Sequence, residues 1–200
     1  MKNIPTDFLY VPDNSWGHID TDDENMHDIF SEINKLVSPK NVIEIGMFAG
    51  HSTLLMMNIF DKLNSITSYD ISEVSTENHN RIVERYPIHK FKQMPIWGDE
   101  NSHQNIDLVF IDGDHDYDPV MQDTISAIKI KPRYILYDNL TSPGVRKATK
   151  EIFANTNLPL NIRHNGLWDK MFEPKYFFYI SKYKTRISPV VMGLFKLQSN

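Results

Sequence analysis

The sequence predicts an α/β fold with a doubly wound sheet of seven strands, mostly parallel with an antiparallel final strand, and helices on both faces. Short apolar runs that suit buried strands alternate with segments of helical spacing from residue 24 to residue 155. Several of these apolar runs end in acidic or glycine-containing segments, as strands do at the ligand-binding edge of such sheets. Two more strand-like segments, 158–164 and 175–183, close the predicted sheet.

The composition is that of a globular protein rather than a fibrous or membrane protein. The 200 residues are enough for one domain with a core, and 40% of them are hydrophobic and 24% charged. A net charge of −5 gives no general attraction to nucleic acid or to anionic membranes, so neither is expected as a partner. Because there is no cysteine, disulfides and thiolate metal sites are excluded. No signal peptide or apolar span is found, and we predict a cytoplasmic protein.

The chain is predicted to be a single domain over 1–200, in which 1–39 is a cover segment with a helix, 40–182 is the core and 183–200 is a tail. The helix is expected over 24–37, because its apolar residues recur on one face and Pro39 follows its end. The aromatic residues before it, Phe8, Tyr10 and Trp16, either pack on the domain or form part of a lid. The tail either docks on the body or contributes to a homodimer interface.

The stretch from Asn41 to Thr53 predicts a buried strand, a glycine turn and the start of a helix. Glu44 is the unusual residue, since it places a carboxylate in an apolar strand. Gly46 and Gly50 permit a tight turn and close approach of the backbone to a ligand. The first amides of the following helix offer a polar binding spot. The candidate cofactor-binding residues of this stretch are Glu44, Gly46, Phe48, Gly50, His51 and Ser52.

A second strand, over 65–71, ends with Asp70 and Ile71, which join the candidate binding residues. Asp70 lies about 20 residues after the glycine turn, the spacing at which a carboxylate commonly binds the two hydroxyls of a ribose. The alternative is an ordinary polar residue at a strand end or a helix cap.

The next segments are a helix over 73–86, stopped by Pro87, a short strand over 90–94 and a loop over 95–101. Trp97 and Asp99 in this loop have the side chains that an adenine ring would contact. An ordinary loop is the alternative interpretation.

The stretch from Ile106 to Tyr117 is the second informative one. An apolar strand over 108–111 leads into a dense polar cluster, and a helix is expected to begin at Asp118-Pro119. A further strand over 133–139 ends in another polar pair, and a helix follows over 144–155. Because these strands are predicted to be parallel, their polar ends should lie at the same edge of the sheet. These polar residues are Asp112, Asp114, His115, Asp116, Asp138 and Asn139.

The pattern Glu44-x-Gly46-x-x-x-Gly50 resembles the first motif of class I S-adenosylmethionine-dependent methyltransferases. The phrase 110–117 resembles the Asp-Gly-x-His-x-Tyr signature of the methyltransferases known as family 24. It is also similar to macrocin and cephalosporin-type O-methyltransferases and, more distantly, to the catechol and caffeoyl-CoA enzymes. This resemblance covers about 40–182. It implies a Rossmann-like fold, S-adenosylmethionine as cofactor, and O-methylation of a small hydroxylated molecule.

The resemblance also implies roles for the second polar group. Asp112, Asp138 and Asn139 match the family's metal ligands, and their oxygen atoms suit a hard cation such as Mg²⁺, which lowers the pKa of an acceptor hydroxyl. Catechol-like members carry a lysine where this chain has His115, which becomes the candidate general base. Asp112 and His115 also count among the candidate catalytic and cofactor-binding residues. The alternatives are that Asp112 binds only the cofactor, that Asp138 and Asn139 only cap a loop, and that His115 is structural.

Three other functions were weighed against this one. An N-methyltransferase is disfavoured because no Asn/Asp-Pro-Pro-Tyr/Phe motif occurs. A nicotinamide-dependent oxidoreductase is disfavoured because Phe48 and His51 stand where Gly-x-Gly-x-x-Gly needs glycine. A binding protein without activity would have no need of the acidic clusters. The sequence does not name the small-molecule acceptor.

Overall fold

The computed structural model describes residues 5–12, 24–155, 179–184 and 189–197, and the chain forms two compact units, 1–95 and 96–200. Each unit combines parallel strands with helices, so the predicted α/β class is confirmed. None of the helices in the described ranges is long and apolar enough to cross a membrane.

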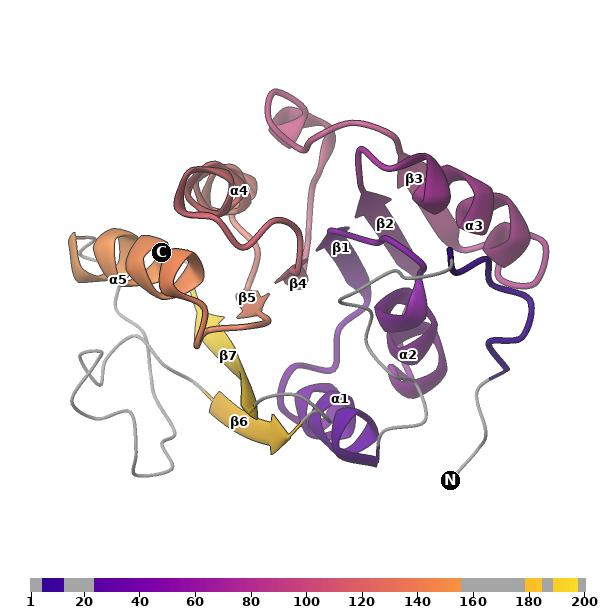
Figure 1. Ribbon diagram of the computed structural model, residues 1–200, viewed down its shortest axis with the longest axis horizontal. Helices are drawn as coiled ribbons and strands as arrows, with labels where there is room; N and C mark the ends of the chain where they lie inside the picture. Colours follow the sequence, from indigo (N-terminus) through magenta and orange to yellow (C-terminus); the bar gives the residue numbers. More distant parts are fainter. Residues whose placement is uncertain (1–4, 13–23, 156–178, 185–188, 198–200) are drawn as a thin grey trace. The chain divides into compact units, whose positions relative to one another are not determined.

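The first unit consists of a parallel three-stranded sheet and three helices. Its strands β1 (Asn41–Ile45), β2 (Ser65–Tyr69) and β3 (His89–Lys92) pair in parallel in the order β3-β2-β1. Helices α1 (Glu24–Val37) and α2 (His51–Ile59) lie side by side, and α3 (Glu73–Val83) packs against β3 (Figure 1). Since the strands are parallel, the chain leaves β1 and β2 at the same edge.

Apolar burial holds this first unit together. Val42 and Ile43 of β1 and Ile66 of β2 are buried almost completely, as expected for strands covered by helices. Helix α1 buries one face, through Ile29, Phe30, Ile33 and Val37.

The N-terminal segment 5–12 packs on α3. The Asn78 side chain accepts a hydrogen bond from the Tyr10 amide at 2.6 Å and donates one to the Tyr10 carbonyl at 2.7 Å. Arg81 donates to the Phe8 carbonyl, and the guanidinium of Arg85 lies 3.9 Å from the centre of the Phe8 ring. The backbone of this segment is therefore held on α3 and the Phe8 ring lies against Arg85, while the Tyr10 side chain is 42% exposed and Trp16 lies outside the described residues.

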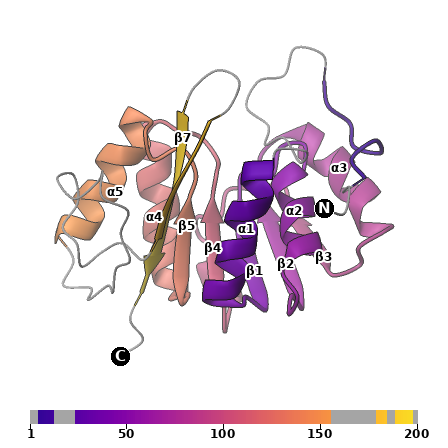
Figure 2. The ribbon, with the colours of Figure 1, turned by 90° about the horizontal axis from the view of Figure 1, so that it is seen from below.

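The second unit contains the remaining strands. Strands β4 (Leu108–Ile111) and β5 (Tyr134–Tyr137) are parallel, β7 (Pro189–Lys196) is antiparallel to β5, and β6 (Tyr179–Lys184) is antiparallel to β7, in the order β4-β5-β7-β6. Helices α4 (Tyr117–Ile130) and α5 (Pro143–Asn155) lie side by side (Figure 2), and a short 3₁₀ turn, η1, spans Glu100–Ser102. The predicted antiparallel final strand is confirmed as β7.

The segment predicted as a tail is instead the last strand. β6 corresponds to the predicted strand 175–183, while the predicted strand 158–164 and the connector 165–174 lie outside the described residues. Strand β7 lies between β5 and β6, and Met192, Leu194 and Phe195 are completely buried. A strand buried on both faces is a continuous apolar run without alternation, so the sequence pattern of this segment does not distinguish a strand of the sheet from a tail that docks on the body.

Phe195 joins three elements of this unit. Its ring stacks on Phe153 of α5 at a centroid distance of 4.4 Å and meets Tyr137 of β5 edge to face at 5.2 Å.

We therefore expect Phe195→Ala to lower the free energy of unfolding by about 3–5 kcal/mol, because it removes a buried aromatic ring. The adjacent Lys196→Ala, which changes a half-buried side chain, is the control. Chemical denaturation of both variants measures the difference. Equal stabilities would mean that 189–196 does not hold its place in the sheet.

Candidate functional site

The glycine turn after β1 has the backbone shape that the motif predicts. Gly46 and Gly50 have φ angles of 88° and 85°, and Phe48 between them has φ 44°. Any other residue at Gly50 would be strained by this left-handed backbone, and its Cβ would also come to 2.7 Å from Cδ1 of Ile82. A left-handed phenylalanine is unfavourable by itself and persists only where neighbours hold it.

Asp70 is the neighbour that holds this turn. Its Oδ2 accepts the amides of Met47 at 2.8 Å and Phe48 at 2.7 Å, and its Oδ1 accepts the amide of Ser72 at 2.8 Å. A carboxylate offers about four acceptor positions, so about one remains for a ligand hydroxyl. The structure thus brings Asp70 to the turn, as the spacing predicts, and gives it a structural task that the sequence did not indicate.

Glu44 lies beneath the turn, with no exposed surface. It accepts hydrogen bonds from Ser52 and Thr53 at the start of α2, both at 2.6 Å, and from Ser68 of β2 at 2.5 Å. These bonds connect Glu44 to the start of α2 and to β2, and its place among the cofactor-binding residues stays a prediction. Burial raises the pKa of Glu44, and the three hydroxyls oppose that shift by stabilising the ionised form.

The other predicted residues of this unit surround the turn. His51 and Ser52 are buried in the first turn of α2, where their backbone amides rather than their side chains can serve a ligand. Ile71 is 75% exposed, which is unusual for isoleucine and is consistent with an apolar cover for a bound ring.

In the second unit, the ends of β4 and β5 bring the predicted polar residues together. His115 Nε2 lies 3.6 Å from Asp112 Oδ1 and 3.3 Å from Asn139 Nδ2. The same Asn139 nitrogen donates to Asp138 Oδ2 at 3.2 Å. In this arrangement Nε2 of His115 accepts a hydrogen bond, so its lone pair faces the cluster and the neutral ring carries its proton on Nδ1.

A close backbone contact holds this cluster in place. The Cα of Gly144, at the start of α5, lies so close to the 115–117 loop that a Cβ would come within 2.2 Å of the His115 carbonyl oxygen. Ser142 Oγ donates to the same carbonyl at 3.5 Å. Gly144 was predicted only as a helix start, and its close contact with a loop 30 residues away is visible only in three dimensions.

The predicted metal ligands have suitable donor atoms. Asp112, Asp138 and Asn139 carry carboxylate and amide oxygens, the donors that Mg²⁺ takes. Within the described ranges, no three side chains of histidine, cysteine, aspartate or glutamate are placed to hold an ion together. An ion here would therefore depend on the Asn139 oxygen and on water, and the ligand roles stay a prediction.

The loop that contains Trp97 is connected to α4 by hydrogen bonds to two buried acids. Trp97 Nε1 donates to Asp123 Oδ1 at 2.8 Å, and Glu100 accepts from Ser126 at 2.8 Å and from Lys129 at 3.2 Å. The indole remains 42% exposed, so the loop is fixed while one side of the ring stays available. The sequence offered one signal for these partners, which is the spacing of the polar residues at 123, 126 and 129 on one helix face.

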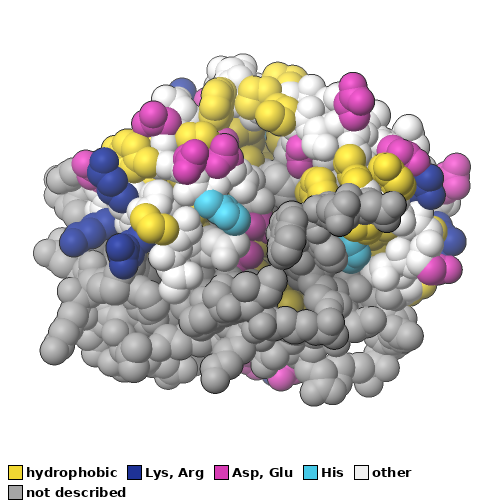
Figure 3. Space-filling view, viewed as in Figure 1, with side chains coloured by type: hydrophobic (Ala, Val, Ile, Leu, Met, Phe, Trp, Pro, Cys, Tyr) yellow, Lys and Arg dark blue, Asp and Glu magenta, His cyan; other side chains and the backbone are white. Residues whose placement is uncertain are grey.

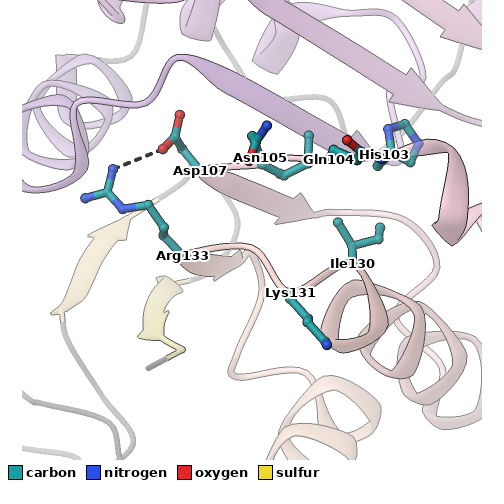
Figure 4. Close-up of a pocket in the computed structure, with 8 residues that line it drawn as sticks. His103, Gln104, Asn105, Asp107, Ile130, Lys131 and Arg133 are labelled. Atoms are coloured by element: carbon teal, nitrogen blue, oxygen red, sulfur yellow. Dashed lines mark hydrogen bonds and ion pairs between the residues drawn. The ribbon is translucent and has the colours of Figure 1, made fainter. Parts of the chain in front are cut away.

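A cavity of about 600 Å³ lies at the opposite ends of β4 and β5 (Figure 4). Its lining includes Asp107 and Arg133, which form an ion pair at 3.0 Å, and Lys131 at the end of α4. This position, at the amino ends of the strands, is separate from the predicted polar cluster of the same unit.

Basic side chains of this unit gather on α5. Arg146, Lys147 and Lys150 are exposed there, and Figure 3 shows the basic patch at the left, over α5. Lys147 Nζ lies 4.0 Å from the centre of the Tyr117 ring.

Asp123 gives a pH-dependent prediction. Burial raises the pKa of Asp123 to about 6 from 3.8, with the Trp97 bond opposing and the Asp114 charge adding to the shift. The protonated form is thus favoured by folding, so its stabilisation is present below pH 3.8 and is lost as pH rises through about 6. We expect Asp123→Asn to become more stable than the parent by about 2 kcal/mol at pH 8, with little gain at pH 4.

Thermal unfolding of both proteins from pH 4 to pH 8 measures this difference. The exposed Asp118→Asn on the same helix is the control and should show no such trend. Parallel pH profiles for the parent and Asp123→Asn would contradict the prediction.

Comparison with known proteins agrees with the motifs. Residues 43–133 match the profile of a family described as a methyltransferase domain. Caffeoyl-CoA O-methyltransferase 1 of Arabidopsis thaliana is 32% identical in an alignment 116 residues long, which covers 52% of this chain and 44% of that protein. The match thus spans less than half the length of this curated relative.

Solved structures resemble the chain over most of its length. An O-methyltransferase from Bacillus cereus in complex with SAH has a TM-score of 0.65 at 13% identity, covering 91% of this chain and 84% of its own. The O-methyltransferase TomG from Streptomyces achromogenes, in complex with SAM, has a TM-score of 0.63 at 13% identity, covering 86% and 79%. At these identities the likeness concerns the fold, and it confirms the predicted Rossmann-like class.

Proposed function

We propose that the protein is an S-adenosylmethionine-dependent O-methyltransferase of a small hydroxylated molecule. The premise is that residues 43–133 belong to the methyltransferase family that the sequence motifs resemble. The observation that carries the proposal is the glycine turn held by Asp70 at the ends of β1 and β2. The similarity to the Arabidopsis relative, a caffeoyl-CoA O-methyltransferase, supports oxygen as the methylated atom.

The first unit has the residues to hold the cofactor. The remaining acceptor position of Asp70 suits a ribose hydroxyl, and exposed Ile71 suits the face of an adenine ring. The amides at the start of α2 suit a carboxylate, because helix N-termini favour anions. When bound, S-adenosylmethionine supplies an electrophilic methyl group on a sulfonium.

The second unit has the residues to activate a hydroxyl. Nε2 of His115, which accepts a hydrogen bond in the structure, can take the proton of an acceptor hydroxyl. Asp112, 3.6 Å away, would then stabilise the imidazolium that forms. S-adenosylmethionine would supply the methyl group to the acceptor oxygen, with the electrons of the carbon–sulfur bond left on its sulfur.

Asp112, Asp138 and Asn139 would hold a divalent cation, if one takes part. Such a cation supplies Lewis acidity that lowers the pKa of a bound hydroxyl. A homodimer and a cytoplasmic location remain predictions, which sedimentation and cell fractionation would test.

Asp70 provides the first test. Calorimetric titration with S-adenosylmethionine should show binding to the parent protein. Asp70→Asn should weaken this binding about ten- to a hundredfold, because the backbone amides then lose their hydrogen bonds to a charged carboxylate. Asp61→Asn, which changes an exposed acid of the same unit, is the control and should bind normally. Absence of binding to the parent protein would refute the proposed function.

Asp138 provides the second test, which concerns catalysis rather than cofactor binding. Asp138→Asn should lower methyl transfer to a catechol or sugar acceptor by about a hundredfold while leaving cofactor affinity unchanged, since a buried carboxylate of the cluster is lost. Asp107→Asn, at the amino end of β4, is the matched control. Adding EDTA to the parent protein shows whether turnover needs a cation, and turnover by Asp138→Asn equal to that of the parent would remove Asp138 from the site.

A further inference from the structure

A line of four polar side chains runs from beneath the glycine turn to the outer helix of the first unit. Ser68 Oγ lies 2.5 Å from Glu44 Oε2 and 3.0 Å from His89 Nε2. His89 Nδ1 lies 3.1 Å from His79 Nδ1 on α3. Glu44 and Ser68 have no exposed surface and His89 is 2% exposed, so water does not substitute for the bonds that Ser68 makes to them.

The donor and acceptor roles of the four side chains determine where the hydrogen atoms of this line lie. Two imidazoles joined through Nδ1 need one donor and one acceptor, so the two neutral rings must hold opposite tautomers. The oxygen–oxygen distances of 2.5–2.6 Å around Glu44 are those of hydroxyls that donate to a charged carboxylate. With Ser68 donating to Glu44, His89 must donate from Nε2, and His79 must donate from Nδ1 to His89.

We infer that Ser68 and His89 are positioning residues of the glycine turn, which set the affinity for the cofactor by holding Glu44 beneath the first turn of α2. This inference rests on the proposed function. Neither residue touches the ligand-facing side of the turn in the first unit. Both act through Glu44, whose other partners are Ser52 and Thr53.

The contacts explain how the effect would reach the cofactor. Glu44 has three hydroxyl donors for its two oxygens, and loss of Ser68 leaves a buried carboxylate with only the two from α2. A buried carboxylate that lacks a hydrogen-bond donor is unfavourable, so the Glu44 side chain would shift to strengthen its remaining bonds. That shift would displace the two residues that still donate to it. Those residues begin α2, whose amides are the proposed anion-binding groups.

The outer end of the line is also fixed. His79 is half-buried, and its ring stacks on Phe91 of β3 at a centroid distance of 5.5 Å. Burial lowers the pKa of His79, and burial together with His79 lowers the pKa of His89 to about 3. Both rings are therefore neutral near pH 7, as opposite tautomers require.

The tautomers can be observed without any cofactor. Long-range ¹H–¹⁵N correlation spectra of the free protein, assigned with His79→Gln and His89→Gln, report which nitrogen of each ring carries the proton. We expect opposite tautomers, with the proton on Nε2 of His89 and on Nδ1 of His79. The same tautomer in both rings would overturn the line of hydrogen bonds.

Calorimetric titration with S-adenosylmethionine tests the positioning role. Ser68→Ala should weaken binding about tenfold, as the loss of one bond to a charged group does. Ser65→Ala is the matched control, because it removes a hydroxyl from the same strand whose bond goes to Asn41. His89→Leu should weaken binding severalfold, whereas His89→Gln, which keeps an N–H donor, should bind within about twofold of the parent.

Thermal unfolding and methyl-transfer kinetics separate positioning from general loss of structure. Positioning predicts a raised KM for S-adenosylmethionine, with kcat within about twofold of the parent at saturating cofactor. Parent-like affinity in folded Ser68→Ala and His89→Leu would overturn the inference. If the parent protein itself binds no S-adenosylmethionine, the proposed function fails, and the tautomers still show whether the hydrogen bonds exist.

Discussion

A carboxylate without exposed surface, Glu44, is the group on which the first unit depends. It connects β1 to the start of α2 through Ser52 and Thr53, and to β2 through Ser68. Burying such a group is unfavourable unless hydrogen-bond donors stabilise its charge, and the three hydroxyls do so at both of its oxygens. The conformation of the glycine turn follows, because both of its ends are held by the same side chain and by the strand that carries it.

The second acid of this unit, Asp70, completes the turn from the other side. By accepting two consecutive amides, it offsets the unfavourable left-handed backbone of Phe48. Glu44 thus holds the turn from below, and Asp70 holds it from the end of β2. The proposed ligand-binding surface between them consists mainly of backbone, and the two acids hold that backbone in shape.

In the second unit, close packing holds the polar side chains of the site in place. Gly144 lets α5 approach the loop after β4 closely enough to set the position of His115, while parallel pairing of β4 and β5 places Asp112 and Asp138 at one edge. The aromatic contacts of Phe195 hold β7 beside β5, and α5 packs on the same ring through Phe153. The polar cluster is therefore supported by an apolar core that the motif does not include.

The sequence by itself determined the local features of this protein. The strand, glycine turn and helix of 41–59, the spacing to Asp70, and the polar ends of β4 and β5 follow from short-range patterns, because backbone preferences and strand ends act over a few residues. Only the tertiary structure decided the partners of Glu44, the Trp97–Asp123 bond, the contact of Gly144, and the place of β7. Apart from the two nearby partners of Glu44 on α2, those contacts join residues 24 to 62 positions apart, and strand register and helix packing select them from many side chains of equal chemistry.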